Sequence, residues 1–265
     1  MSEQPMMLQI RSADAKNGIL RHFPPLLSSL GVESPRAHAI ASKFTDLLDA
    51  PEDRILEEIG HLLADEGLVE PWGHALATAR AEHLARWIAP HLLGPRVIDV
   101  LCGDGAVGTR LEALTSAQVH LVERSDQRGV VERSWFPRIE DFDAFAAHAE
   151  PCMCDTAIVS TVLHHETNPQ RTLALAARCA SQRVVVVENC IEPQYGQDYQ
   201  LLVDAMFNRS LYRTRLAWPG EHRTAEDWVT MCAQYGRAHI VDRCTTVPAI
   251  PLAHTLIVVD LEATR

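Results

Sequence analysis

Residues 161–169 read TVLHHETNP and place two imidazoles and a carboxylate side by side. His164, His165 and Glu166 directly follow an apolar run and precede Asn168-Pro169, a pair typical of a turn or a helix start. Imidazole and carboxylate groups bind divalent metal ions, and imidazole exchanges protons near neutral pH. A His-His pair can also lie in a solvated loop without a function. The secondary-structure elements around the pair are therefore needed to choose between the two interpretations.

The chain after Pro95 alternates between short apolar runs and helical stretches. Strands are predicted at residues 96–101, 118–123, 156–163, 183–188, 238–244 and 254–261. Helices are predicted within VGTRLEAL and NPQRTLALAARCA and over residues 199–211 and 225–235. This alternation predicts an α/β fold with a doubly wound, mostly parallel sheet. Ligands bind such sheets at the C-terminal ends of the strands, which is where the two histidines fall.

The first third of the chain looks helical and carries no strand signal. Ser34-Pro35 and Ala50-Pro51 are typical helix starts, and a further helical segment runs from about Gly73 to His91 before Gly94-Pro95 ends it. We therefore predict two parts, a helical region over residues 1–94 and an α/β domain over residues 95–265.

Composition narrows the classes of partner. The 24 Lys and Arg residues against 35 Asp and Glu residues give a net charge of −11, without a basic block, so neither nucleic acid nor an anionic membrane is expected. Seven cysteines scattered through apolar segments indicate free thiols in a reducing compartment. The N-terminus has no signal-peptide pattern, and no run reaches the roughly 18 apolar residues of a membrane span. We expect a cytoplasmic protein and leave a homodimer open.

The stretch VIDVLCGDG over residues 97–105 joins a predicted strand to a predicted helix. It resembles the first motif of the class I S-adenosylmethionine-dependent methyltransferases, in which an acid-ending strand leads into Gly-x-Gly-x-Gly. The resemblance implies that four residues lie at the cofactor: Asp99, Cys102, Gly103 and Gly105. One departure is Leu101, which replaces the first glycine of the family pattern, so the approach of the cofactor must differ there.

Further matches extend the resemblance over about residues 90–265. Glu123 ends a strand about 20 residues after the glycines, where an acid can hold ribose hydroxyls. Asp141 and Phe142 match a short acidic loop after the third strand that faces adenine in the family, and Thr161 matches the end of the fourth strand. The resemblance implies a seven-stranded Rossmann-like methyltransferase sheet with a helical N-terminal lid. GDGAVG also fits the G-x-G-x-x-G pattern of NAD(P)-dependent oxidoreductases, which stays an alternative.

The histidines narrow the resemblance to one subgroup, the metal-dependent α-keto acid C-methyltransferases. These enzymes act on phenylpyruvate, 4-methyl-2-oxopentanoate or 5-guanidino-2-oxopentanoate, and bind a metal through a His in this loop and a second His far downstream. His222 follows His164 by 58 residues. The resemblance therefore implies a divalent metal, Zn or Fe, held by His164 or His165 together with His222. Which loop histidine binds is left open, because neighbours in an extended loop point to opposite sides.

The subgroup implies methylation at C3 of a small 2-oxo acid through a metal-stabilised enolate. His165 or Glu166 would be the base and Arg223 would hold the substrate carboxylate. Acidic residues near the expected pocket, including Glu192 and Asp204, favour the cationic 5-guanidino-2-oxopentanoate as the substrate. The alternatives are a metal-free O- or N-methyltransferase with histidine as a general base, the oxidoreductase, and a regulatory protein that binds the cofactor without chemistry.

Overall fold

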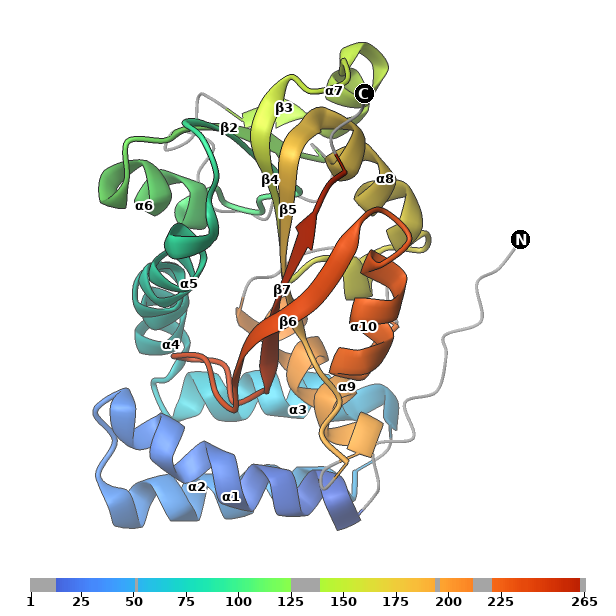
Figure 1. Cartoon of the computed structure of the whole chain (residues 1–265). Helices are drawn as coiled ribbons and strands as arrows, with labels where there is room; N and C mark the ends of the chain where they lie inside the picture. The colour runs from blue at the N-terminus through green and yellow to red at the C-terminus, as the bar shows by residue number, and fades with distance from the viewer. Residues whose placement is uncertain (1–12, 51, 125–138, 194–195, 212–220, 263–265) are drawn as a thin grey trace.

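A computed structural model describes residues 13–50, 52–124, 139–193, 196–211 and 221–262. Within them, seven strands form one sheet in the order β3-β2-β1-β4-β5-β7-β6 (Figure 1). The strands are β1 Arg96–Val100, β2 Gln118–Glu123, β3 Ile139–Asp141, β4 Cys154–Ser160, β5 Ala180–Asn189, β6 Arg237–Cys244 and β7 His254–Asp260. Strands β1 to β5 pair in parallel, and β7 runs antiparallel between β5 and β6. The predicted doubly wound α/β fold is confirmed.

The six predicted strands are all present, with bounds that shift by a few residues. Strands β4 and β7 are buried on both faces, which explains their continuous apolar runs. The prediction for the third strand was wrong. Residues 139–141 form β3 itself, although we had assigned them to the loop that follows it. A three-residue edge strand that pairs only with β2 carries too few side chains to show an apolar pattern.

Five helical segments follow or cross the strands. They are α6 Ala106–Leu114, α7 Phe142–His148, α8 Pro169–Cys179, α9 Gly196–Met206 with its continuation, the π-helix η5 Phe207–Leu211, and α10 Ala225–Cys232. Helix α8 begins where the sequence predicts it, because the Asn168 side chain accepts a hydrogen bond from the Arg171 N–H and Pro169 fits the first turn.

The N-terminal helices cover one end and one side of the sheet. Those within residues 13–65 lie across the end, beside α9, and the helix over residues 81–88 lies at the side, beside α6 (Figure 1). They are α1 Ala13–Ser29, α2 Ser34–Leu47, α3 Glu52–Asp65, α4 Val69–Ala75, the π-helix η1 Leu76–Arg80, α5 Ala81–Ile88 and the 3-10 turn η2 Ala89–His91. Their buried side chains share one hydrophobic core with residues of β1, β5 and α9. The indole of Trp72 packs against Phe23 and Phe207 and donates a hydrogen bond to the Ala249 carbonyl at 2.8 Å. These helices therefore brace the end of the sheet at which α9 lies.

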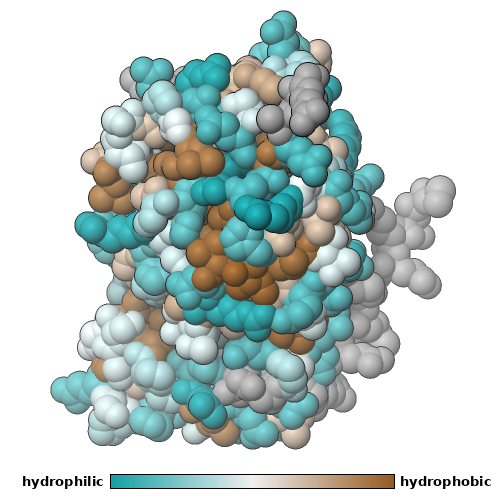
Figure 2. Space-filling model, viewed as in Figure 1, coloured by the Kyte–Doolittle hydropathy of each residue, from teal (hydrophilic) through white to brown (hydrophobic). Residues whose placement is uncertain are grey.

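The surface is mostly polar on the face seen in Figure 2. Hydrophobic side chains gather near its middle, where Figure 1 has β6 and β7. Strand β6 is the outer strand and carries Val241, one of few large apolar side chains that are exposed. None of the helices that the structure describes is both long and apolar enough to cross a membrane.

Candidate active site

The two neighbouring histidines lie in a tight turn at the C-terminal end of β4. Leu163–His165 form a 3-10 turn, η4, whose start is held by the Glu188 carboxylate. That carboxylate accepts hydrogen bonds from the Val162 and Leu163 N–H groups at 2.7 and 2.6 Å. Successive side chains of a 3-10 turn are about 120° apart rather than opposite. The assumption of an extended loop was therefore wrong, and the rings of His164 and His165 lie side by side, 4.0 Å between centroids.

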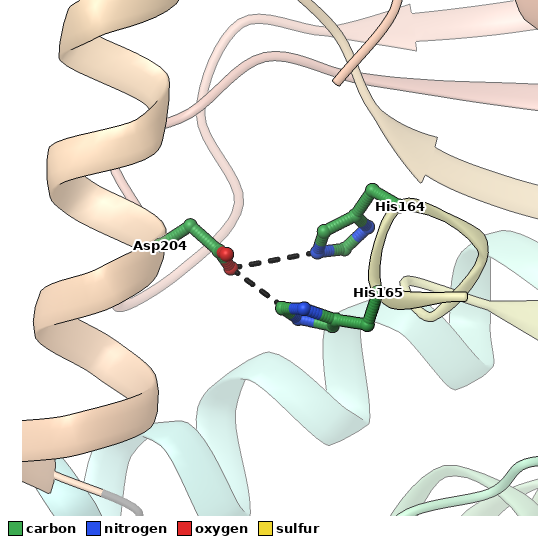
Figure 3. Close-up of side chains that lie close together, drawn as sticks. All are labelled: His164, His165 and Asp204. Carbon is green, nitrogen blue, oxygen red and sulfur yellow. Dashed lines mark ion pairs between the residues drawn. The ribbon is translucent and has the colours of Figure 1, made fainter. Parts of the chain in front are cut away.

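Both imidazoles point toward one carboxylate, that of Asp204 on α9 (Figure 3). The Nε2 atoms of His164 and His165 lie 3.4 and 3.5 Å from Asp204 Oδ1. Asn208, one helical turn further on, donates a hydrogen bond to the same oxygen at 3.0 Å. One ligand atom from each of the three residues falls within 4.8 Å of the others, which is a spacing that one metal ion can bridge.

Sequence analysis missed the position of Asp204 in this cluster and counted it only among acids that favour a cationic substrate. No motif marks it, because its distance from the histidines is set by the packing of α9 across the end of the sheet. One weak signal was present. Asp204 and Asn208 are polar residues four positions apart in an otherwise apolar stretch, so they share one face of a helix.

His222 joins the cluster from a separate segment, as the long-range spacing had suggested. Its ring stacks on His164 at 5.0 Å, and its Nε2 lies 3.8 Å from Asp204 Oδ2. The Nδ1 atom donates a hydrogen bond to Asn189 Oδ1 at 3.2 Å. Backbone contacts fix this segment, since the Glu221 N–H donates to the His164 carbonyl at 2.7 Å. Three imidazoles thus converge on a single buried carboxylate.

Burial and charge give the histidines different protonation states. Burial alone would lower the pKa of His164, but the carboxylates of Glu188 and Asp204 outweigh it and raise this pKa to about 10. Burial, followed by the positive charge of His164, lowers the pKa of His165 to about 4 and that of His222 to about 3. The three imidazoles together hold the pKa of Asp204 below its usual range despite burial. At neutral pH, and without a metal, His164 is therefore charged and the other two imidazoles are neutral, and a metal bound to His164 would displace its proton.

Several ligand atoms of this cluster have no hydrogen-bond partner within the described part of the chain. They are His165 Nδ1, His222 Nε2 and Asp204 Oδ2, and all three are buried. A buried polar atom without a partner costs about 1–3 kcal/mol, so three in one place call for an explanation. Nitrogen and carboxylate ligands suit Zn or Fe(II), so the donor set fits the metal that the resemblance implies.

Glu166 lies apart from the histidine cluster. Its carboxylate forms a two-pronged ion pair with the guanidinium of Arg124, and the Thr172 hydroxyl donates to it at 3.0 Å. The guanidinium also lies over the ring of Phe142, 4.7 Å from its centroid. Because Glu166 is buried and paired in this way, its geometry gives no support to the predicted role as base.

Arg223 also lies outside the cluster. Its guanidinium pairs with Glu221 at 2.6 Å and lies 5.7 Å from the Trp228 ring. No contact joins it to the histidines within the described residues, and neighbouring residues of an extended segment point to opposite sides. The geometry therefore does not support the predicted role of Arg223 in holding the substrate carboxylate.

The predicted cofactor residues around the glycine turn meet at the ends of β1 and β2. Glu123 accepts a hydrogen bond from the Gly103 N–H at 2.6 Å. Burial is the main reason why the pKa values of Asp99 and Glu123 are both raised to about 7, and burial also raises that of the Cys102 thiol. Two acids shielded from water beside a glycine turn form a site that hydroxyl or ammonium groups of a ligand can complete.

Leu101 adopts a backbone conformation that favours glycine. Its φ is 58°, in the left-handed region shared by Gly103 at 61° and Gly105 at 74°. A β-carbon makes that conformation unfavourable by about 1–2 kcal/mol. The buried Leu101 side chain offsets this cost by packing in the core beneath the turn. The turn therefore forms although a leucine stands at a position where glycine would be unstrained.

The last three predicted cofactor residues have structural partners of their own. The Asp141 carboxylate caps α7 by accepting the N–H groups of Asp143 and Ala144, each at 3.1 Å. Phe142 is fully buried, so its ring belongs to the core and offers no surface to adenine. Thr161 lies at the end of β4 with φ 55° and accepts a hydrogen bond from Arg80 at 2.5 Å.

Comparisons with known proteins support the fold. A SAM-dependent methyltransferase from Thermotoga maritima, described as a possible histamine N-methyltransferase, superposes with a TM-score of 0.54 at 15% identity, covering 77% of this chain and 99% of its own. The YcgJ protein of Bacillus subtilis gives a TM-score of 0.50 at 12% identity, covering 68% and 98%. No protein-family model matches the sequence, and no curated protein matches it. The fold is therefore the α/β fold of SAM-dependent methyltransferases.

Proposed function

We propose that this protein is an S-adenosylmethionine-dependent methyltransferase. The fold supports this, together with the position of Asp99, Gly103 and Glu123 at the C-terminal ends of the first two strands. In this position Glu123 would hold the ribose hydroxyls, and Asp99 would face the positively charged methionine part of the donor. No observation favours the oxidoreductase alternative.

We further propose that the methyl acceptor is a small 2-oxo acid, methylated at C3 with help from a divalent metal. One observation carries this proposal, namely three imidazoles that converge on the buried carboxylate of Asp204. A divalent ion bound there would withdraw electrons from the ketone of the acceptor and so acidify its C3–H bond. We keep 5-guanidino-2-oxopentanoate as the proposed acceptor on the sequence argument alone.

The hydrogen bonds around the rings suggest which histidines would hold the metal. A metal-binding histidine usually donates its other N–H group to a carboxylate or carbonyl. His164 has this arrangement, with Nδ1 at 2.7 Å from Glu188, and His222 has it with Asn189. In both rings Nε2 is left facing Asp204. We therefore propose that His164 and Asp204, which share the 4.8 Å spacing described above, hold the metal and that His222 is the further ligand.

His165 is left for proton transfer. Its Nε2 faces Asp204, whereas Nδ1 is buried with no hydrogen-bond partner among the described residues. The lowered pKa of about 4 keeps the ring neutral at physiological pH, as a base must be. Nδ1 would take the proton from C3, and that carbon would then attack the methyl group of the donor, which leaves as S-adenosylhomocysteine.

Deuterium exchange at C3 of a panel of 2-oxo acids, without methyl donor, tests the metal and the base together. The wild-type protein should catalyse exchange that a chelator abolishes, whereas His222→Ala and His165→Ala should lack it. His61→Ala, in an exposed position of α3, is the matched control and should behave as wild type. Metal-free protein that methylates an O or N acceptor, indifferent to chelator, would replace this proposal by the metal-free alternative.

A further inference from the structure

Arg80 connects the N-terminal helices to the loop that carries the histidines. It is the last residue of the π-helix η1, between α4 and α5. Its Nη2 donates a hydrogen bond to the Thr161 hydroxyl, at the strained end of β4. Single π-turns inside helices occur often at functional sites, and so do residues held in the left-handed region. Two unusual backbone segments therefore meet at one guanidinium.

The charge of Arg80 has no carboxylate partner in the part of the chain that the structure describes. Within the described residues, no acidic oxygen lies within 4.0 Å of its guanidinium, and its Nε is buried without a hydrogen bond. Arg124 and Arg183 are likewise partly buried, but each pairs with an acid, Glu166 and Asp260 respectively. A shielded charge is unfavourable unless an opposite charge and hydrogen bonds compensate it. The position is thus prepared for an anion from outside the described chain.

The charge of Arg80 affects groups on both the cofactor side and the histidine side of the site. Its charge counteracts the burial that raises the pKa of Asp99, on the cofactor side. On the other side it adds to the burial that lowers the pKa of His254, at the start of β7 next to Asn189. The guanidinium therefore acts on the region between the glycine turn and the histidine cluster, where donor and acceptor must meet.

We propose that Arg80 binds a carboxylate at this junction, and this inference rests on the proposed methyltransferase function. Its guanidinium can bind a carboxylate with two parallel hydrogen bonds. The proposed substrates supply two such groups, the methionine carboxylate of the donor and the carboxylate of the 2-oxo acid. Arg80 replaces Arg223, which is paired with Glu221, as the carboxylate-binding arginine.

Calorimetry with two nucleosides tests the proposal. S-adenosylhomocysteine carries the amino-acid carboxylate, whereas 5′-methylthioadenosine keeps the adenosine and sulfur but lacks it. If Arg80 binds the methionine carboxylate, Arg80→Met should weaken S-adenosylhomocysteine binding by about 10- to 100-fold and leave 5′-methylthioadenosine binding unchanged. If it binds the acceptor, the same variant should leave both nucleosides unchanged and raise the KM of the 2-oxo acid by a similar factor.

Arg80→Lys should recover part of the lost affinity, because it keeps the charge without the planar fork. Arg86→Met is the matched control on α5, since its side chain is 67% exposed, and should change neither value. The role of Arg80 would be overturned if Arg80→Met weakened the binding of both nucleosides equally, or if it changed neither the affinities nor the KM. Either result would leave the proposed function intact. Wild-type protein that binds neither nucleoside would overturn the proposed function, and this inference with it.

Discussion

The molecule contains two clusters in which histidines surround one carboxylate, one at the surface and one in the interior. On the surface, His120 and His148 each lie 2.6 Å from one oxygen of Glu140. In the interior, His164, His165 and His222 surround Asp204 at 3.4 to 3.8 Å. The exposed group satisfies its own carboxylate with two short ion pairs. The buried group leaves three ligand atoms without a hydrogen-bond partner among the described residues, so burial and spacing rather than residue type mark the site.

The largest effect is expected from Asp204→Asn, which removes the carboxylate on which the buried group converges. Metal content should fall below one ion per chain, and C3 exchange should drop by more than about 100-fold. Elemental analysis and exchange rates measure both. The corresponding surface change, Glu140→Gln, should alter neither. Equal metal content in the two variants would mean that the buried group differs from the exposed one only in burial.

Glu188→Gln should have the next largest effect, although this residue does not face Asp204. It removes the charge that holds Nδ1 of His164 and the backbone of η4. Partners of this kind change metal affinity by about 10- to 100-fold. Competition with a chelator gives the affinity, and thermal unfolding of the metal-free protein shows whether η4 is still in place. Unchanged affinity would restrict Glu188 to a structural role in the turn.

A pH effect is expected from His254, which is buried beside the site and has a pKa lowered to about 3 by burial. The unfolded chain binds a proton near pH 6.5, but the folded chain does not. The stability is therefore present above pH 6.5 and is lost as the pH falls, by about 2 kcal/mol between pH 6.5 and 5. Urea unfolding of chelator-treated protein measures this loss. His254→Asn should reduce the slope of the free energy of unfolding against pH. An identical slope in the variant would contradict the role of His254.

The smallest effect is expected at the surface group. Burial acts to raise the pKa of Glu140, but the hydrogen bonds from His148 and His120 outweigh it and lower this pKa, and Glu140 in turn raises the pKa of His148. His148 therefore adds stability below its unfolded pKa and loses it as the pH rises through the folded value. Solvent screening limits such pairs, so Glu140→Gln should change the free energy of unfolding by less than about 1 kcal/mol. A loss of about 3 kcal/mol or more, as expected when a buried ion pair is broken, would remove the contrast between the groups.

Sequence patterns predicted the elements with long apolar runs, because burial on both faces leaves a continuous signal, as in β4 and β7. They also located the loop with His164 and His165 at the edge where ligands bind. The prediction failed at β3, where three residues are too few for a pattern. At Phe142 the family motif predicts a position near adenine, and the structure shows its ring fully buried at the start of α7.

Residue types and their order determined the fold class and the glycine turn, and the family resemblance that they carry implied the pairing of the loop with His222. Only the tertiary structure decided which side chains meet. Asp204 lies beside the histidines because α9 packs across the end of the sheet. Glu166 is not part of the cluster because its carboxylate is paired with Arg124. Arg80 reaches the site through a π-turn that has no sequence signature. Contacts between distant segments depend on the rotation and packing of whole elements, which local periodicity does not encode.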